Sequence, residues 1–536
     1  MEHKQKRTLF KAAGFLMITM VISRILGYVR DIIVYNQFGQ NRITDAYNAS
    51  FTIPDFVYML LVGGALSAAF IPIFSSYIAN DKAEEGWKVA SIVFNWIIVL
   101  LVVFLTVCFI FTPQLVNLIV PGFNPDAQLM TVNLTRIMFL QVIFLTFSGI
   151  SMGILNSFKH FTSPAIGSVL YNLGIIVGGL LLASSIEAKW PGYGIAGFSV
   201  GVVIGAALYF LVQIPALKKV GLRYHFSFDL KNPGVQNLIM LIIPVLIGLS
   251  ASEINVIISQ NLASGLSDGL VSALRIAERI MKLPIGIFAI SIAVAIFPTL
   301  TAYMAKNEEK EFKGAVSLGL RSVIFVTLPA AVALAVLSTP FIRFMFEWGG
   351  DFTSVETART VGPLIFYCVG LVAYSAIHVL SRTFYAMQDT KTPVFCSVLS
   401  IGINICFCLL LVGPMAANGI ALAYSIAGLF NMFLLLYLYK RRMQYIGGRK
   451  ILSSVAKMGI ASAAMAGALF LVSGVFEINA DMSNKIIQII GVLLSIGVGI
   501  AVYFLVTYRW KMEESVMVMD IMKKKFFKRK KVGGES

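Results

Sequence analysis

Apolar runs of roughly 20 residues, separated by short groups of charged residues, recur along the whole chain. An α-helix needs about this length to cross a hydrocarbon core of ~30 Å, whereas a transmembrane β-barrel would show alternating segments of ~10 residues. The pattern predicts an all-α polytopic membrane protein with about fourteen transmembrane helices. They are expected at 10–34, 44–78, 89–112, 131–156, 164–184, 194–215, 237–262, 269–302, 315–339, 361–385, 393–412, 418–439, 453–474 and 485–508.

The composition agrees with a membrane protein and argues against a soluble one. Charged residues make up 13% of the 536 residues and hydrophobic residues 58%. Soluble domains carry roughly 25% charged residues. The net charge of +17 is assigned to membrane topology, because no basic face or module typical of nucleic-acid binding is present.

Lysine and arginine are distributed unequally between alternate loops, which predicts the orientation. With the N-terminus in the cytoplasm, the outer loops contain only Arg42, Lys189, Arg343, Arg359 and Lys485. The first apolar stretch is too long for a cleaved signal peptide and is expected to be retained. The chain is therefore predicted to lie in the cell (inner) membrane as a multi-pass protein with both termini cytoplasmic.

The two halves of the chain resemble each other at offsets of 225 to 229 residues. The matching segments are Leu155–Pro164 with Phe384–Pro393, Gly194–Ala196 with Gly419–Ala421, and Ala69–Pro72 with Ala295–Pro298. Six helices per copy give both copies the same orientation, so the lobes should be related by an axis along the membrane normal, as in alternating-access transporters. The predicted parts are an N-terminal lobe at 1–220, a C-terminal lobe at 221–442, helices 13 and 14 at 443–510, and a basic cytoplasmic tail at 511–536.

Two of the predicted helices contain clusters of ionisable residues. A charge in the membrane costs about 2.5–3.5 kcal/mol on insertion scales, so such residues usually face a cavity or a partner. Arginine suits phosphate because its planar fork donates two parallel hydrogen bonds and stays charged. The clusters are Ser23, Arg24, Arg30 and Asp31 in 10–34, and Arg275, Glu278, Arg279 and Lys282 in 269–302.

The alternative to a binding site is internal pairing. Arg30 could pair with Asp31 or Asp45, and Arg275 could pair with Glu278. Arg24 and Arg279 have no carboxylate three or four residues away, so an anionic ligand is favoured for them. Asp45 could equally be a charge favoured by the N-terminus of its own helix.

An enzymatic function finds no support in the sequence. The four histidines lack a metal-ligand spacing, and neither a phosphate-binding loop nor a Gly-x-Ser-x-Gly motif occurs. No cofactor is expected, and a metal ligand set cannot be named. The energy for transport should therefore come from a gradient, such as the membrane potential, or from the substrate itself.

Several segments resemble the MurJ (MviN) lipid II flippases of the multidrug/oligosaccharidyl-lipid/polysaccharide exporter superfamily. These segments are Ser23–Asp31, Thr44–Tyr47, Gly64–Pro72 and Ala277–Gly286. The resemblance implies transport of undecaprenyl-diphosphate-linked peptidoglycan precursor to the outer leaflet. It also implies a lipid-tail groove at helices 13 and 14, and cell-wall synthesis proteins as further partners. Some members of that family bind sodium, so coupling to sodium is a further expectation. The substrate-binding residues that it implies are Arg24, Arg30, Arg279, Ser23, Asp45 and Ser272, to which the charge pattern adds Arg275 and Lys282.

The chain also departs from the pattern of that family. Tyr58 stands where some members have a third arginine, Gly63 where they have a glutamate, and Lys282 where they have a carboxylate. Three other functions compete with the lipid II flippase. They are a flippase for another lipid-linked oligosaccharide such as an O-antigen unit, a drug/cation antiporter, and a scaffold without transport; the cationic clusters argue against the last two.

Overall fold

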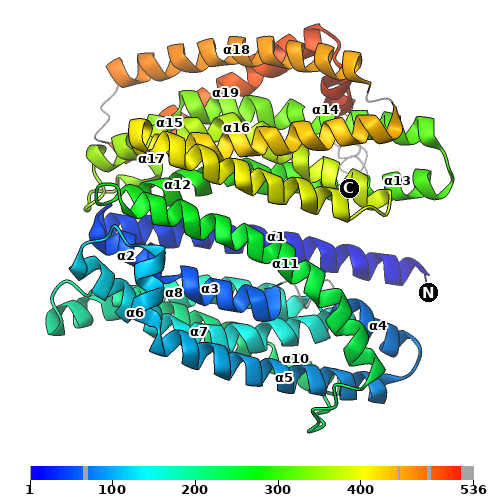
Figure 1. Ribbon diagram of the computed structural model, residues 1–536. Coiled ribbons are helices and arrows are strands. Elements are labelled where there is room, and N and C mark those ends of the chain that lie inside the picture. The colour runs from blue at the N-terminus through cyan, green and yellow to red at the C-terminus, as the bar shows by residue number, and fades with distance from the viewer. Residues whose placement is uncertain (1, 64–69, 445–446, 480–483, 521–536) are drawn as a thin grey trace, which may run out of the picture. The chain divides into compact units, whose positions relative to one another are not determined.

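The computed structural model describes residues 2–63, 70–444, 447–479 and 484–520, and all regular elements in these ranges are helices. Part of the Gly64–Pro72 segment and the basic residues after 520 lie outside these ranges. Ten of the described helices are long and apolar enough to cross a membrane. The predicted all-α polytopic fold is thereby confirmed (Figure 1).

The chain divides into two compact units, the first comprising residues 1–272 and 349–352 and the second 273–348 and 353–536. The first contains α1 Glu2–Phe38, α2 Arg42–Ser50, α3 Thr52–Tyr58, η1 Met59–Gly63, α4 Ile71–Ala79, α5 Ala83–Ile110, α6 Thr112–Ile119, α7 Pro125–Ser157, α8 Thr162–Lys189, α9 Ala196–Leu211, α10 Ile214–Lys219 and α11 Pro233–Ser264. The second contains most of α12 Leu270–Pro284, then η3 Ile285–Ala289, α13 Ile290–Ala305, α14 Glu309–Val336, α15 Ser338–Phe346, α16 Ser354–Ala386, α17 Lys391–Met443, α18 Gly448–Asn479 and α19 Lys485–Arg509. This division assigns α11 to the first unit, whereas the predicted lobe boundary at 220 rests on the sequence repeat and stays a prediction.

Helix α17 accounts for two of the predicted helices. Its 53 residues would extend about 80 Å at 1.5 Å per residue, far more than one crossing requires. Ala416 has the non-helical backbone angles φ 49° and ψ −129°, so the helical axis breaks there. The break falls in the predicted connection between 412 and 418.

The predicted helices at 44–78 and 269–302 are both interrupted by π-helical turns. These turns begin at Met59 and Ile285, which are 226 residues apart (285 minus 59). That separation matches the offset of the sequence repeat. Because the two turns are separated by the repeat offset, the interruption is a shared feature of the two copies. A π-helical turn widens the helix locally and is frequent at functional sites.

Helices α8 and α9 of the first unit pack through glycines. A Cβ atom placed on Gly174 or Gly178 would lie 2.5 Å from the Cα atom of Gly205 or Gly201, respectively. Each helix therefore presents two glycines four residues apart to the other. Small residues at this spacing let helix backbones approach closely in a membrane, where no hydrophobic effect drives helices together.

In the second unit, α18 packs against α14 and α19 (Figure 1). The short helix at 513–520 is joined to α14 by a buried ion pair. Arg321 Nη1 lies 2.6 Å from Glu514 Oε1, and both side chains are only 3% exposed. Arg321 Nη2 and Lys450 Nζ also contact Glu513, at 3.0 Å and 3.1 Å. This cluster fixes the end of the described chain to the helices of its own unit.

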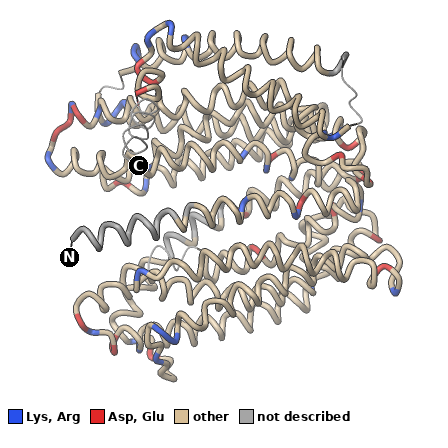
Figure 2. Tube along the Cα trace, turned by 180° about the vertical axis from the view of Figure 1, so that it is seen from behind, with Lys and Arg blue, Asp and Glu red and all other residues tan. Residues whose placement is uncertain are grey.

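Charged residues gather near helix ends and connections, with long uncharged tracts between them (Figure 2). This distribution is expected where the middle of each helix lies in hydrocarbon. The charges on α1 and α12, together with Arg136 on α7 and Arg321 on α14, are among the exceptions, because they occur within the helices themselves.

Candidate functional site

Ser23 and Arg24 lie on α1 in different surroundings. The Ser23 hydroxyl donates to the carbonyl oxygen of Ser168 at 3.0 Å, and the amide of Asn172 donates to Ser23 Oγ at 3.3 Å. Ser23 therefore joins α1 to α8. The side chain of Arg24 is exposed and makes no ion pair with any described residue. Its guanidinium keeps its hydrogen-bonding capacity for a ligand.

Arg30 pairs with its neighbour Asp31. Its Nε and Nη2 atoms donate to the same carboxylate oxygen of Asp31, at 3.0 Å and 2.8 Å. The two side chains are only 15% and 12% exposed. Of the pairings considered from the sequence, the one with Asp31 is therefore the one observed. The Nη1 atom of Arg30 takes no part in this contact, so its N–H groups are not used by Asp31.

Asp45 and Ser272 bond to each other within the first unit. The Asp45 carboxylate accepts from the Ser272 hydroxyl at 2.6 Å, from the Ser272 backbone N–H at 2.8 Å and from the Gly269 N–H at 2.6 Å. Gly269 and Ser272 flank the first turn of α12. Asp45 thus caps α12 from a different helix, where a carboxylate is stabilised by unpaired N–H groups and by the helix dipole.

Further polar groups surround this contact. The amide of Asn48 donates to the Tyr35 hydroxyl at 2.9 Å and to Ser272 Oγ at 3.0 Å. The Ser272 hydroxyl also lies 3.2 Å from Thr44 Oγ1. The sequence interpretation did not include Asn48. An asparagine three residues after Asp45, on the same helical face, was a usable signal because a polar side chain in such a segment needs partners.

The cationic residues of α12 follow directly after this cap. Lys282 Nζ lies 2.5 Å from Glu278 Oε1, one turn earlier on the same helix. The side chain of Lys282 is 53% exposed and that of Glu278 is 26% exposed. Arg275 and Arg279 are half-buried, one turn apart on a common face. Helix α12 contains the three basic side chains Arg275, Arg279 and Lys282 and the one acidic side chain Glu278.

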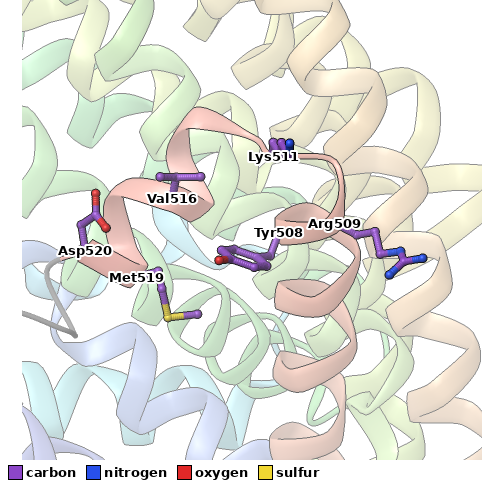
Figure 3. Close-up of a pocket in the computed structure, with 6 residues that line it drawn as sticks. All are labelled: Tyr508, Arg509, Lys511, Val516, Met519 and Asp520. Carbon is purple, nitrogen blue, oxygen red and sulfur yellow. The ribbon is translucent and has the colours of Figure 1, made fainter.

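A hollow beside the end of α19 was considered as a second candidate site. The hollow beside the end of α19 has a volume of about 510 Å³ and is lined by Tyr508, Met519 and Asp520 among others. In Figure 3 the Tyr508 ring is turned toward Met519 and Asp520, while the Arg509 guanidinium points away from them. This hollow therefore does not bring basic groups together around a bound anion.

In the part of the chain that the structure describes, no group of three or more histidine, cysteine or acidic side chains could hold a metal ion.

Helices α18 and α19, expected to form a lipid-tail groove, expose large apolar side chains. Leu471 is 68% exposed on α18 and Leu505 is 71% exposed on α19. An apolar surface of this kind is compatible with hydrocarbon chains. The groove itself stays a prediction.

The fold and the charged helices define a class, that of multi-pass membrane transporters. An inward-facing multidrug resistance transporter of the MATE family superimposes with a TM-score of 0.66 over 81% of this chain and 99% of its own, at 14% identity, which shows a shared fold. A structure described as lipid II flippase MurJ in an inward closed conformation superimposes with a TM-score of 0.77. It covers 95% of this chain and 99% of its own, at 27% identity.

The sequence comparisons narrow the class to one family. The family model described as lipid II flippase MurJ matches residues 34–490. A probable lipid II flippase MurJ of Rhizobium tropici is 29% identical over 91% of each chain. Another, of Buchnera aphidicola subsp. Acyrthosiphon pisum, is 31% identical over 79% of this chain and 82% of its own. The chain belongs to the lipid II flippase MurJ family.

Proposed function

We propose that this protein moves lipid II, an undecaprenyl-diphosphate-linked peptidoglycan precursor, from the inner to the outer leaflet of the cell membrane by alternating access. The observation that carries the proposal is the family match over residues 34–490. Because these relatives are flippases, the protein is a transporter and not an enzyme.

The diphosphate of the substrate is the group that arginines recognise in this proposal. Arg24 is exposed on α1 without an acidic partner among the described residues, and α12 contains three basic side chains and one acidic side chain. An arginine fork donates two parallel hydrogen bonds to a phosphate and remains charged throughout the cycle. Arg24, Arg30 and Arg279 are the proposed diphosphate ligands, and Ser23, Arg275 and Lys282 are further proposed substrate-binding residues.

Asp45 and Ser272 have a different part in the proposed cycle. Both side chains are buried, and their mutual hydrogen bonds satisfy them in this conformation. A bond that holds the first turn of α12 can stabilise one state of an alternating-access cycle and be exchanged in another. We assign them to this conformational contact, and contact with the substrate would require the bond to open.

Complementation tests the proposed function. The gene is expressed in cells depleted of their own lipid II flippase, and growth is followed together with labelling of outer-leaflet lipid II by a reagent that cannot cross the membrane. Restored growth and labelling are expected. Growth failure with normal membrane abundance would refute the proposal, and rescue only of cells lacking an O-antigen flippase would assign a different lipid-linked glycan.

The membrane location follows from the family, while the finer topology is part of the proposal. The excess of lysine and arginine in alternate loops supports a cytoplasmic position for both termini. Cell-wall synthesis proteins are the proposed protein partners, since they make and consume lipid II on the two sides of the membrane.

A further inference from the structure

Arg136 on α7 is a charged residue that the proposed transport cycle does not use. It lies 11 residues after Pro125, about 16 Å along the helix. Its Nε atom is buried without a hydrogen-bond partner, and no described residue forms an ion pair with it. Its guanidinium carbon lies 5.2 Å from the centre of the Phe109 ring on α5. That ring contact leaves the hydrogen-bond donors of the guanidinium unused.

Arg136 stands at one end of a groove of about 290 Å³ between α5 and α7. On α7 the groove is lined by Arg136, Phe139, Leu140 and Ile143, at positions i, i+3, i+4 and i+7, which share one helical face. Leu140 is 51% exposed, so the groove opens at the surface of the protein. Ile143 lies about 10 Å further along α7 than Arg136.

The α5 side of the groove is mostly apolar, so the charge of the groove comes from Arg136. Phe109 and Ile110 form its last turn, beside Arg136, and Leu105 lies one turn deeper. The hydroxyl of Thr106 is the other polar side chain of the lining. Because α5 ends at Ile110, the charged end of the groove lies toward the membrane boundary and its apolar end toward the hydrocarbon. The groove therefore matches an amphiphile with an anionic head and a hydrocarbon chain.

We infer that this groove binds an anionic glycerophospholipid of the leaflet at which α5 ends and α7 begins. The lipid phosphate accepts hydrogen bonds from Arg136, and an acyl chain extends past Thr106 along Leu105 and Ile143. A phospholipid is the occupant to which these observations point, because the groove opens on the apolar flank of two membrane-spanning helices. The inference does not depend on which substrate the protein transports.

Native mass spectrometry of the full-length protein tests the inference. Protein stripped of lipid is mixed with phosphatidylglycerol or with phosphatidylcholine, and the lipid that stays bound is counted. Wild-type protein should retain phosphatidylglycerol about five-fold more strongly, because its headgroup has a net negative charge, whereas the choline ammonium of phosphatidylcholine offsets the phosphate charge beside Arg136. Arg136→Gln should lower retention to the phosphatidylcholine level, and Arg136→Lys should fall between.

Two further variants separate the groove from general surface charge. Leu140→Trp fills the groove while the arginine stays, and should reduce retention of both lipids. Arg42→Gln removes an exposed arginine of the same unit, 52% accessible and paired with Asp126, and should retain lipid like the wild type. Melting temperatures verify that each variant is folded, and if Arg136→Gln does not fold, the lysine and tryptophan variants decide the question.

Three outcomes would overturn the inference. The first is wild-type retention of phosphatidylglycerol in Arg136→Gln, and the second is equal retention of the two lipids by wild-type protein. The third is displacement of phosphatidylglycerol by an equal concentration of undecaprenyl diphosphate through Arg136, which would make the groove a substrate site. Transport is not the readout, so failure here leaves the proposed function intact.

Discussion

The carboxylate of Asp45 on α2 accepts a hydrogen bond of 2.6 Å from the hydroxyl of Ser272 on α12, 227 residues further along the chain. Asp45 is 2% exposed and Ser272 is fully buried. A buried carboxylate is costly unless it is hydrogen-bonded, and here the backbone N–H groups of Gly269 and Ser272 contribute as well. The contact therefore fixes where α12, with its arginines, begins.

This relationship predicts graded effects of substitution. Asp45→Ala removes the acceptor of all three donors and leaves them buried, so it should destabilise the protein by about 2 kcal/mol. Ser272→Ala keeps both backbone donors and should cost less. Thermal unfolding of the purified protein measures the order of the two effects, and complementation should follow it. Equal stability of both variants and the wild type would contradict the capping role.

The proposed diphosphate ligands can be tested separately. Arg24→Ala and Arg279→Ala should each abolish complementation while membrane abundance stays normal, because losing a membrane-embedded charge does not impede insertion. Lysine at either position should be partly defective, since a point charge lacks the bidentate fork. Arg42→Ala, at an exposed ion pair, is the control and should grow like the wild type. Full activity of an alanine variant would remove that arginine from the site.

The close approach of α8 and α9 predicts strong intolerance at its glycines. A Cβ atom on Gly178 would lie 2.5 Å from the Cα atom of Gly201, so Gly178→Leu must separate the two backbones. We expect a loss of at least 2 kcal/mol in stability and reduced membrane abundance. Gly402→Leu is the matched control, because its Cβ would meet no atom within 4 Å. Similar melting temperatures for the two variants would contradict this packing.

The ion-pair cluster at the end of the chain predicts a dependence of stability on pH. Hydrogen bonds from Lys450 and then Arg321 hold the pKa of Glu513 below its ordinary value. The unfolded state therefore binds the proton first as the pH falls. The stability that Glu513 contributes is fully present above its unfolded pKa and is lost as the pH falls through the lowered folded pKa.

Melting temperatures measured from pH 7 downward check this dependence. Wild-type protein should lose more stability in the acid range than Glu513→Gln, by less than about 1 kcal/mol because Glu513 is half exposed. Glu85→Gln alters a glutamate that is 59% exposed and lies 3.9 Å from Lys82, and its profile should follow the wild type. Coinciding profiles for the wild type and Glu513→Gln would contradict the role of the cluster.

The membrane potential is the proposed energy source. A charge that crosses the whole field gains about 2.3 kcal/mol per 100 mV, and a diphosphate moving outward carries negative charge down that field. The potential should also return the cationic residues of α1 and α12 toward the cytoplasmic side after release. Only part of the field acts on each group, so an effect of ~1 kcal/mol is expected.

An ionophore that collapses the potential should therefore slow the appearance of labelled lipid II in the outer leaflet several-fold. Replacing sodium by choline in a parallel culture separates the potential from a sodium gradient. An unchanged rate, with the loss of potential verified, would exclude the potential as a driving force. It would leave the assignment as a flippase standing.

The sequence by itself determined the all-α membrane class of the protein and the arginines within the predicted helices at 10–34 and 269–302. Helix position follows from local physics, because a segment of sufficient apolar length is stable across hydrocarbon whatever its neighbours are. The π-helical turns at Met59 and Ile285 and the break at Ala416 lay beyond that pattern. An apolar stretch predicts a continuous helix and has no signal for a local change of winding.

The partners of the polar side chains were decided by the tertiary structure alone. From the sequence, both Asp31 and Asp45 were candidate partners of Arg30. In the folded protein Arg30 pairs with Asp31, and the two side chains are buried together. Asp45 was expected to face a substrate or its own helix end, yet it caps α12, whose first turn is more than 220 residues away. Hydrogen bonds of this kind depend on which helices meet and at what depth, and periodicity along one helix does not encode either quantity.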